Sequence, residues 1–105
     1  MKPLERQNSA PLLAERIRLK LMVMIASAEQ PTEFMVLLET LEVTRGNLSS
    51  HLRRLEEAGY IEMAKMFVDR KPKTSFSCTS EGRAALAQYL DELEELVQTC
   101  RRKAI

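Results

Sequence analysis

The sequence predicts a fold that is mainly α-helical, with one small β-hairpin. Residues 44–58 carry leucines at spacings of four and three, which is the repeat of one face of a helix. Residues 60–79 alternate between apolar and polar side chains around a charged, proline-containing break, as the strands of a hairpin do. Residues 80–103 return to helical spacing over a longer stretch. These patterns predict a small helical core with one hairpin and a long last helix.

Length and charge limit what the chain can do. Its 105 residues suffice for one domain with a small core. The net charge of +1 does not indicate general binding of polyanions. The charges are unevenly distributed, however: residues 44–74 carry seven cationic and four acidic side chains, whereas residues 80–100 carry one and five. A basic middle beside an acidic C-terminal helix indicates one face for nucleic acid and another for a different contact.

The sequence indicates neither a metal centre nor catalysis. Cys78 and Cys100 lie far apart, with no CxxC motif and no histidine at metal-ligand spacing, so no cofactor, zinc site or disulfide framework is expected. The only histidine, His51, lacks a neighbouring nucleophile and carboxylate, and there is no glycine-rich phosphate loop. No stretch resembles a signal peptide, and the apolar run 19–28 is too short to span a bilayer. We therefore expect a cytoplasmic protein that is not an enzyme.

The N-terminal part is expected to contain an arm and a helix. Residues 1–8 are predicted to form a flexible arm, and residues 9–105 a single domain. Ser9 is the expected cap of a first helix over residues 12–28. Apolar side chains surround much of the second half of this helix, which is typical of burial on more than one side. In so small a domain this indicates a partner chain, with a central core helix in a monomer as the alternative.

The next two helices match a helix-turn-helix. Thr32 is expected to cap a helix over residues 33–41, and Thr44 to cap the helix that ends before Gly59. The connection between the two helices is short, which is the arrangement of a helix-turn-helix. The second helix is apolar on one face and carries small polar and arginine side chains on the other. Such a face suits a DNA major groove, where Arg and Asn can read base edges; a merely solvated basic face is the alternative.

The hairpin that follows has the character of a wing. Strands are predicted over residues 60–68 and 74–79, with residues 69–73 as the turn between them. Three cationic side chains at this tip could contact phosphate or enter a minor groove. Hairpin tips are often basic for solubility alone, but the position directly after a helix-turn-helix favours a wing.

The last helix is predicted to make a subunit contact. Thr79 or Ser80 is its expected cap, with Glu81 in the first turn. One face is an apolar stripe and the other is acidic. A long amphipathic helix that extends past a small core is best explained by docking on the first helix of a second copy. The predicted dimer interface comprises Leu13, Ile17, Met24, Leu86, Leu90, Leu93 and Val97.

In this order of elements the chain resembles winged-helix regulators of the MarR and ArsR type, and above all small one-domain winged helix DNA-binding proteins. The resemblance covers about residues 12–100 and is carried by LSSHL (48–52), LEEAGYI (55–61), RKPKT (70–74) and CTSEGR (78–83). The chain departs from the pattern at the first residue of the last motif, where such strands usually have an aliphatic side chain. That cysteine could be a redox-sensitive thiol.

The resemblance implies a dimeric, sequence-specific transcription regulator. The middle helix would enter the major groove, the hairpin tip would reach the minor groove, and the terminal helices would form a two-fold dimer, so double-stranded DNA and a second copy are the expected partners. His51 lies at the margin of the open face, where it could bond a phosphate or a backbone carbonyl. The implied DNA contacts are Arg45, Asn47, Ser49, Ser50, His51, Arg53 and Arg54 on the helix, and Arg70, Lys71 and Lys73 on the wing.

Other functions stay open at this point. A winged helix can also serve as a protein-interaction module, because the same fold hosts both uses. A small apolar effector could fit between the terminal helices and the core, although methionine-rich helices are more often adaptable core. Cys100, near the end of the last helix, could cross-link two subunits. The candidate effector-binding residues are Met22, Met24, Leu90 and Leu93.

Overall fold

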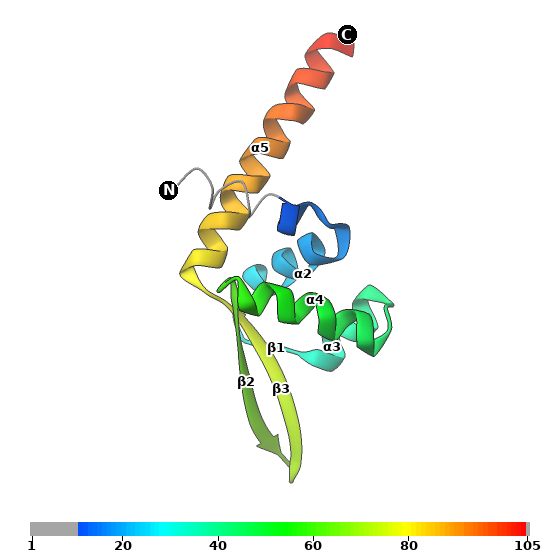
Figure 1. Cartoon of the computed structure of the whole chain (residues 1–105), viewed down its shortest axis with the longest axis vertical. Coiled ribbons are helices and arrows are strands. Elements are labelled where there is room, and N and C mark those ends of the chain that lie inside the picture. The colour runs from blue at the N-terminus through cyan, green and yellow to red at the C-terminus, as the bar shows by residue number, and fades with distance from the viewer. Residues whose placement is uncertain (1–10, 105) are drawn as a thin grey trace.

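The computed structural model describes residues 11–104, so the arm predicted for residues 1–8 and the cap predicted at Ser9 lie outside this part. Its elements are α2 (Arg16–Ser27), β1 (Thr32–Glu33), α3 (Phe34–Leu41), α4 (Arg45–Glu57), β2 (Ile61–Val68), β3 (Lys71–Cys78) and α5 (Ser80–Ala104). Helices α2, α3 and α4 pack together, while the β2–β3 hairpin projects from one end and α5 from the other (Figure 1). The predicted winged helix-turn-helix with a long C-terminal helix is confirmed.

The first helix is interrupted, which corrects the continuous helix predicted over residues 12–28. Residues 11–14 form a helical turn, but Glu15 has an extended backbone (φ −72°, ψ 130°) and begins α2 as its N-cap. The Glu15 carboxylate accepts a hydrogen bond from the backbone N–H of Arg18 at 2.8 Å. The carbonyl of Leu12 accepts from the Arg18 guanidinium at 2.7 Å. Side chains thus satisfy the backbone groups that a continuous helix would have paired.

Helix α2 is a central helix of the single chain. It packs against α4, β3 and α5, and Leu21, Met22 and Ile25 are buried. The wide apolar surface read from the sequence is therefore largely covered within one protomer. Val23 remains exposed over 39% of its surface.

The sheet has a third strand that the sequence did not predict. β1 pairs antiparallel with β3, so the strand order is β1-β3-β2. Thr32 is part of this strand and not the cap of α3; the cap position is Glu33, whose side chain makes no capping hydrogen bond. The backbone of this segment is held by pairing with Ser75 and Phe76. A strand of two residues leaves no periodicity in the sequence.

The turn between α3 and α4 is defined by the residue that ends α3 and by the residue that caps α4. Glu42 adopts a left-handed conformation (φ 54°) after α3 and donates its N–H to the Leu38 carbonyl at 3.1 Å. Thr44 then caps α4, because its hydroxyl accepts from the backbone N–H of Asn47 at 3.1 Å. The predicted cap at Thr44 is confirmed. A left-handed residue followed by an N-cap redirects the chain within a few residues.

The hairpin is longer and its turn tighter than predicted. Asp69 and Arg70 both have positive φ (53° and 67°), and Val68 pairs with Lys71. Two left-handed residues make the type of turn whose twist matches that of antiparallel strands, so the ladder closes after only two residues. Residues 71–73 consequently belong to β3, which corrects the five-residue turn expected over residues 69–73.

The core lies where the helices meet the base of the sheet. Leu37 of α3 joins side chains from α2, α4 and β2. The fully buried side chains are Leu13, Leu21, Met22, Leu37, Leu48, Leu55 and Ile61.

The start of α5 is fixed to the end of α4. The Thr79 hydroxyl donates to the Gly59 carbonyl at 2.6 Å and accepts from the backbone N–H of Gly82 at 2.9 Å. Thr79 is therefore the cap of α5, and it also ties this helix to the turn before β2. A Cβ atom on Gly82 would lie 2.2 Å from the carbonyl oxygen of Tyr60. The close approach of the two segments requires glycine at this position.

We expect Gly82→Ala to lower the free energy of unfolding by about 1–3 kcal/mol, because the added methyl group forces the junction apart. Gly46→Ala is the matched control, since a Cβ there meets nothing within 4 Å. Because alanine is more favourable than glycine in a helix, we expect Gly46→Ala to raise the free energy of unfolding by up to about 1 kcal/mol. Urea denaturation of both variants would measure these changes. Equal stability of the two variants would contradict the tight junction.

Candidate nucleic-acid interface

Helix α4 presents a polar face to solvent because its apolar face is fully used in the core. Leu48 and Leu55 have no exposed surface, and Leu52 has 3%. These leucines fix the rotation of the helix about its axis. The predicted groove residues that are consequently exposed are Arg45, Asn47, Ser49, Ser50, Arg53 and Arg54.

Arg45, at the first position of α4, rests on α3. Its guanidinium carbon lies 6.0 Å from the centre of the Phe34 ring, and its Nη2 donates to the Met35 sulfur at 3.5 Å. These contacts orient the side chain beside the start of α4. The remaining guanidinium N–H groups are available to an external acceptor such as a phosphate.

A cleft of about 340 Å³ separates α4 from the hairpin. The cleft is therefore lined by both elements that the sequence assigned to DNA contact. Its lining residues are Phe34, Ser49, Leu52, Arg53, Glu56, Met63, Thr74 and Phe76.

The strand register determines which wing residues face α4. Met63 pairs with Phe76, and both line this cleft. Side chains on a strand alternate between faces, so Lys65 and Phe67, two and four residues further along β2, share the face of Met63. Sequence reasoning missed Lys65, although its spacing from Met63 in the alternating segment was the available signal.

The wing cations predicted from the sequence do not all share that face. Arg70 lies in the turn at the tip of the hairpin. Lys71 and Lys73 occupy alternate positions of β3, opposite Val68 and Met66, and therefore lie on the face turned away from α4. The Lys73 ammonium is 3.4 Å from the Glu33 carboxylate. Part of its charge is thereby neutralised within the protomer.

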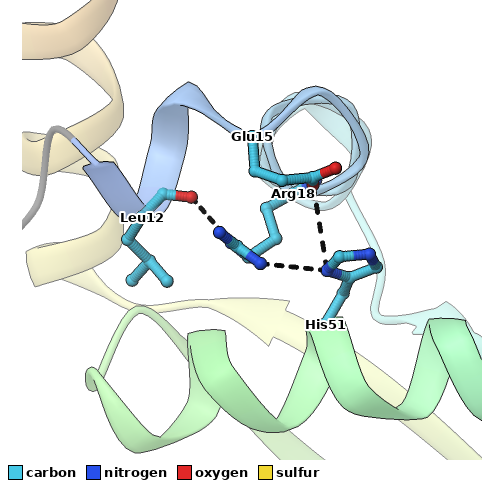
Figure 2. Close-up of polar contacts among 4 residues, drawn as sticks. All are labelled: Leu12, Glu15, Arg18 and His51. Atoms are coloured by element: carbon cyan, nitrogen blue, oxygen red, sulfur yellow. Dashed lines mark hydrogen bonds and ion pairs between the residues drawn. The ribbon is translucent and has the colours of Figure 1, made fainter.

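His51 connects α4 to α2 instead of extending outward (Figure 2). Its Nδ1 lies 3.1 Å from Nη1 of Arg18, which is nine-tenths buried. Because a guanidinium can only donate, this contact is a hydrogen bond in the tautomer that leaves Nδ1 as the acceptor. The Glu15 carboxylate is 3.8 Å from the same nitrogen. In the folded chain Arg18, and not a backbone carbonyl, is the partner of Nδ1; the phosphate contact considered from the sequence stays a prediction.

Arg18 was not predicted to have a role. Its guanidinium bridges the Leu12 carbonyl and His51, so it joins the N-terminal turn, α2 and α4 in one polar cluster (Figure 2). Nothing in the local pattern distinguishes it from a solvated arginine, because its partner His51 is 33 residues away.

The residues assigned to a dimer interface divide into three groups by exposure. Leu13 and Leu86 are buried in the core of the single chain, with 0% and 7% of their surfaces exposed, so their side chains are already covered. Ile17, Met24 and Leu93 are half-buried. Leu90 and Val97 on α5 remain 40% and 46% exposed, and Leu96, which was not assigned, is 67% exposed.

The two thiols lie in different environments. Cys78 is half-buried and donates to the Thr79 carbonyl at 3.4 Å, whereas Cys100 is exposed. Burial raises the pKa of the Cys78 thiol, and the nearby Arg83 charge offsets only part of this effect. A raised pKa leaves less of the reactive thiolate at a given pH, which disfavours Cys78 as a redox-sensitive group.

Residues 11–104 contain neither a candidate metal site nor a candidate membrane span. That part of the chain has no group of three or more His, Cys, Asp or Glu side chains placed to hold a metal ion. It also has no helix whose length and hydropathy would allow it to cross a membrane.

The chain is similar to known proteins over most of its length. A family model described as a winged helix DNA-binding domain matches residues 17–97. An uncharacterised protein of Methanocaldococcus jannaschii is 36% identical over 80 residues, which are 76% of this chain and 86% of that protein.

Solved structures share the fold. The structure of a transcriptional regulator homologue from Pyrococcus horikoshii OT3 superposes with a TM-score of 0.80 at 27% identity, covering 95% of this chain and 98% of that one. A PadR-like transcription factor from Bacteroides fragilis gives a TM-score of 0.71 at 17% identity, covering 95% of this chain and 97% of that one. The structure of MarR superposes with a TM-score of 0.62 at 23% identity, covering 83% of this chain and 69% of that one. At these two lower identities the likeness shows the fold alone.

We expect His51→Ala to lower the free energy of unfolding by about 1–3 kcal/mol, because it leaves a buried guanidinium donor of Arg18 without its acceptor. His51→Asn is the matched control, since its amide oxygen can take the place of Nδ1 and accept from Arg18. Chemical denaturation would measure both variants. The anchoring role of His51 fails if the asparagine variant is as unstable as the alanine variant.

Proposed function

This chain belongs to the winged helix DNA-binding domain family, and from that premise we propose that it is a homodimeric transcription regulator that reads a specific DNA sequence. Its family and its fold, which is shared with PadR-like and MarR proteins, make it a non-enzymatic DNA-binding regulator. The dimer, the sequence specificity and the contacts below are the proposal. We place the activity in the cytoplasm, as the sequence predicts.

The exposed polar face of α4 is the observation that carries the proposal. The helix has 13 residues and is therefore about 20 Å long, and a B-DNA major groove is wide enough to admit it. Gly46, Ser49 and Ser50 are small and exposed, so they permit close approach to the base edges. Arg53 faces the cleft toward the wing, where its planar guanidinium can bond a guanine with two hydrogen bonds.

The wing supplies the contact that does not depend on sequence. Lys65 on the α4 side of the hairpin and Arg70 in its turn carry charge at positions from which phosphates could be reached. Lys71 is exposed next to the turn. When such cations neutralise phosphates, the DNA releases its condensed counterions. Binding is therefore favoured at low salt and weakens strongly as the salt concentration rises. Lys73 contributes less in this proposal because it is paired with Glu33.

A second copy would cover the apolar part of α5. This helix of 25 residues extends away from the core (Figure 1), and Leu90, Leu96 and Val97 are exposed along it. An isolated helix in water is marginally stable, so an extended helix with leucines in solvent favours packing against a partner. A two-fold dimer through α5 would place two α4 helices at half-sites about 34 Å apart, one turn of DNA.

An effector site between the terminal helices and the core is not part of the proposal. Met22 is completely buried in the core, and Met24 is half-buried against it. Both methionines therefore fill space within the protomer, as adaptable core residues do. Binding of a small molecule among them stays a prediction from the sequence.

Specific DNA reading can be tested by selecting duplexes from a randomised library and measuring their affinity by fluorescence anisotropy at two salt concentrations. Arg53→Ala is expected to cost about 1–3 kcal/mol on the selected duplex, with relaxed preference at one base pair. Lys71→Ala should instead weaken all duplexes alike and reduce the slope of the salt dependence by about one.

Arg102→Ala, on the distal part of α5, is the matched control and should bind as the unaltered chain does. If the selection enriches no sequence and the affinity equals that for random duplex, the proposal of sequence-specific reading is wrong and an interaction module becomes the better explanation.

The proposed dimer predicts that Val97→Asp will shift the chain to a monomer in analytical ultracentrifugation and will weaken binding to the selected duplex. A carboxylate would be placed where apolar surface is buried between copies, which is unfavourable without a partner. Gln98→Asp is the control, because it adds the same charge at the neighbouring position, on the margin of the acidic face. It should leave the oligomeric mass unchanged. A monomeric unaltered chain at micromolar concentration, or dimeric Val97→Asp, would count against the α5 interface.

A further inference from the structure

The distal end of the wing carries an aromatic side chain without a covering partner. Phe67 is 77% exposed, the highest exposure among the large apolar side chains of the described residues. The hairpin projects away from the three short helices (Figure 1), so the core is not in a position to cover it. An exposed phenyl ring at the tip of a projecting element is suited to contact with another molecule.

The ring lies on the side of the hairpin that faces α4. On β2 it is four residues beyond Met63 and six beyond the buried Ile61, so all three share one face of the strand. Its cross-strand partner is Pro72. Proline has a fixed φ and a compact apolar ring, so Phe67 and Pro72 together form a short, stiff apolar edge. This edge is the outer continuation of the wall of the cleft next to α4.

The surroundings of the apolar edge are strongly basic. Residues 65–73 contain four cationic side chains and one carboxylate. Of the four cations, Lys73 is paired with Glu33 at 3.4 Å, and the described part of the chain records no ion pair for Lys65, Arg70 or Lys71. Such a charge pattern favours a polyanionic ligand over an apolar protein surface, because burial of unpaired cations on protein is costly.

Phosphate contact accounts for the cations but not for the phenyl ring, since phosphates gain nothing from an apolar neighbour. A DNA minor groove offers what the ring requires, because the deoxyribose of its walls is largely apolar and so are the faces of base pairs that open when a step is unstacked. Proteins that bind the minor groove insert Phe or Pro side chains between base steps, which unstacks the step and kinks the duplex toward the major groove.

We propose that Phe67, supported by Pro72, is a wedge that the wing inserts into the minor groove beside the site bound by α4. The inference rests on the proposed function and adds to it a determinant of sequence. Pyrimidine–purine steps are the easiest to unstack and kink, so the wedge selects a TA or CA/TG step at its position without a hydrogen bond to any base. The wing then contributes to specificity through DNA deformability, in addition to its contact with phosphates.

The test uses the full chain and the duplex obtained by selection from the randomised library. The duplex carries 2-aminopurine at single positions beneath the wing, because the fluorescence of this base rises when it is unstacked. A dye pair at the two ends of the duplex reports bending. The unaltered chain should raise the 2-aminopurine signal at one step and shorten the distance between the dyes. Phe67→Ala should abolish both signals and lower affinity roughly tenfold, as loss of a stacking aromatic does.

Two variants separate a wedge from a general effect on the hairpin. Phe67→Leu keeps an apolar side chain of sufficient length and should retain most of the bending. Met66→Ala removes a side chain that is 51% exposed on the opposite face of the same strand and should match the unaltered chain. Thermal unfolding of each variant checks that the fold is intact, and no large change is expected because these side chains lie outside the core.

The possible failures are distinguishable. If the unaltered chain selects and binds a sequence but Phe67→Ala leaves fluorescence and bending unchanged, the wedge is wrong and the regulator stands. An equal loss with Met66→Ala would also overturn the wedge. If Phe67→Ala changes only the oligomeric mass measured by analytical ultracentrifugation, the apolar edge is a contact between copies and not a DNA contact. If no duplex is selected by the unaltered chain, both the wedge and the proposed function fail.

Discussion

The burial of three leucines of α4 is the constraint on which the interface depends. Leu48, Leu52 and Leu55 are buried against the rest of the core, and each would lose about 1.5–3 kcal/mol of favourable burial if the helix turned them outward. The rotation of α4 is therefore fixed, and with it the set of side chains that can meet an external surface. The cluster of Arg18 and His51 adds a directional contact to this apolar one, because a hydrogen bond of 3.1 Å between α2 and α4 resists sliding of one helix along the other.

The wing depends on a different constraint, which is the register of its strands. A two-residue turn at Asp69 and Arg70 closes the ladder early, so the strands are eight residues each and carry the turn far from the core. Register also separates the charges of the wing into two faces. Lys65 lies on the side of α4 and Lys73 on the other, next to Glu33. Moving the register by one residue would exchange these faces, so the turn geometry controls which cations share a side with the open face of α4.

What could be predicted from the sequence was what local patterns specify. The leucine repeat of α4 and the hydroxyl cap at Thr44 are local, and both were predicted. The strand Thr32–Glu33 and the break at Glu15 were not, because they arise from pairing with Ser75 and Phe76 and from hydrogen bonds with Arg18. The candidate site shows the same division. Exposure of the polar face of α4 followed from periodicity, whereas the engagement of His51 by Arg18 required the folded chain.

The junction at Thr79 joins the candidate DNA-binding elements to the helix proposed to form the dimer. Thr79 bonds the Gly59 carbonyl at the end of α4 and the Gly82 N–H in the first turn of α5, and its own N–H donates to the Tyr60 carbonyl before β2. These bonds join the end of α4, the base of the wing and the start of α5. In a dimer through α5, the distance between two α4 helices would then depend on the packing of α5 against its partner. A change in that packing would alter the half-site spacing, which a rigid duplex tolerates poorly.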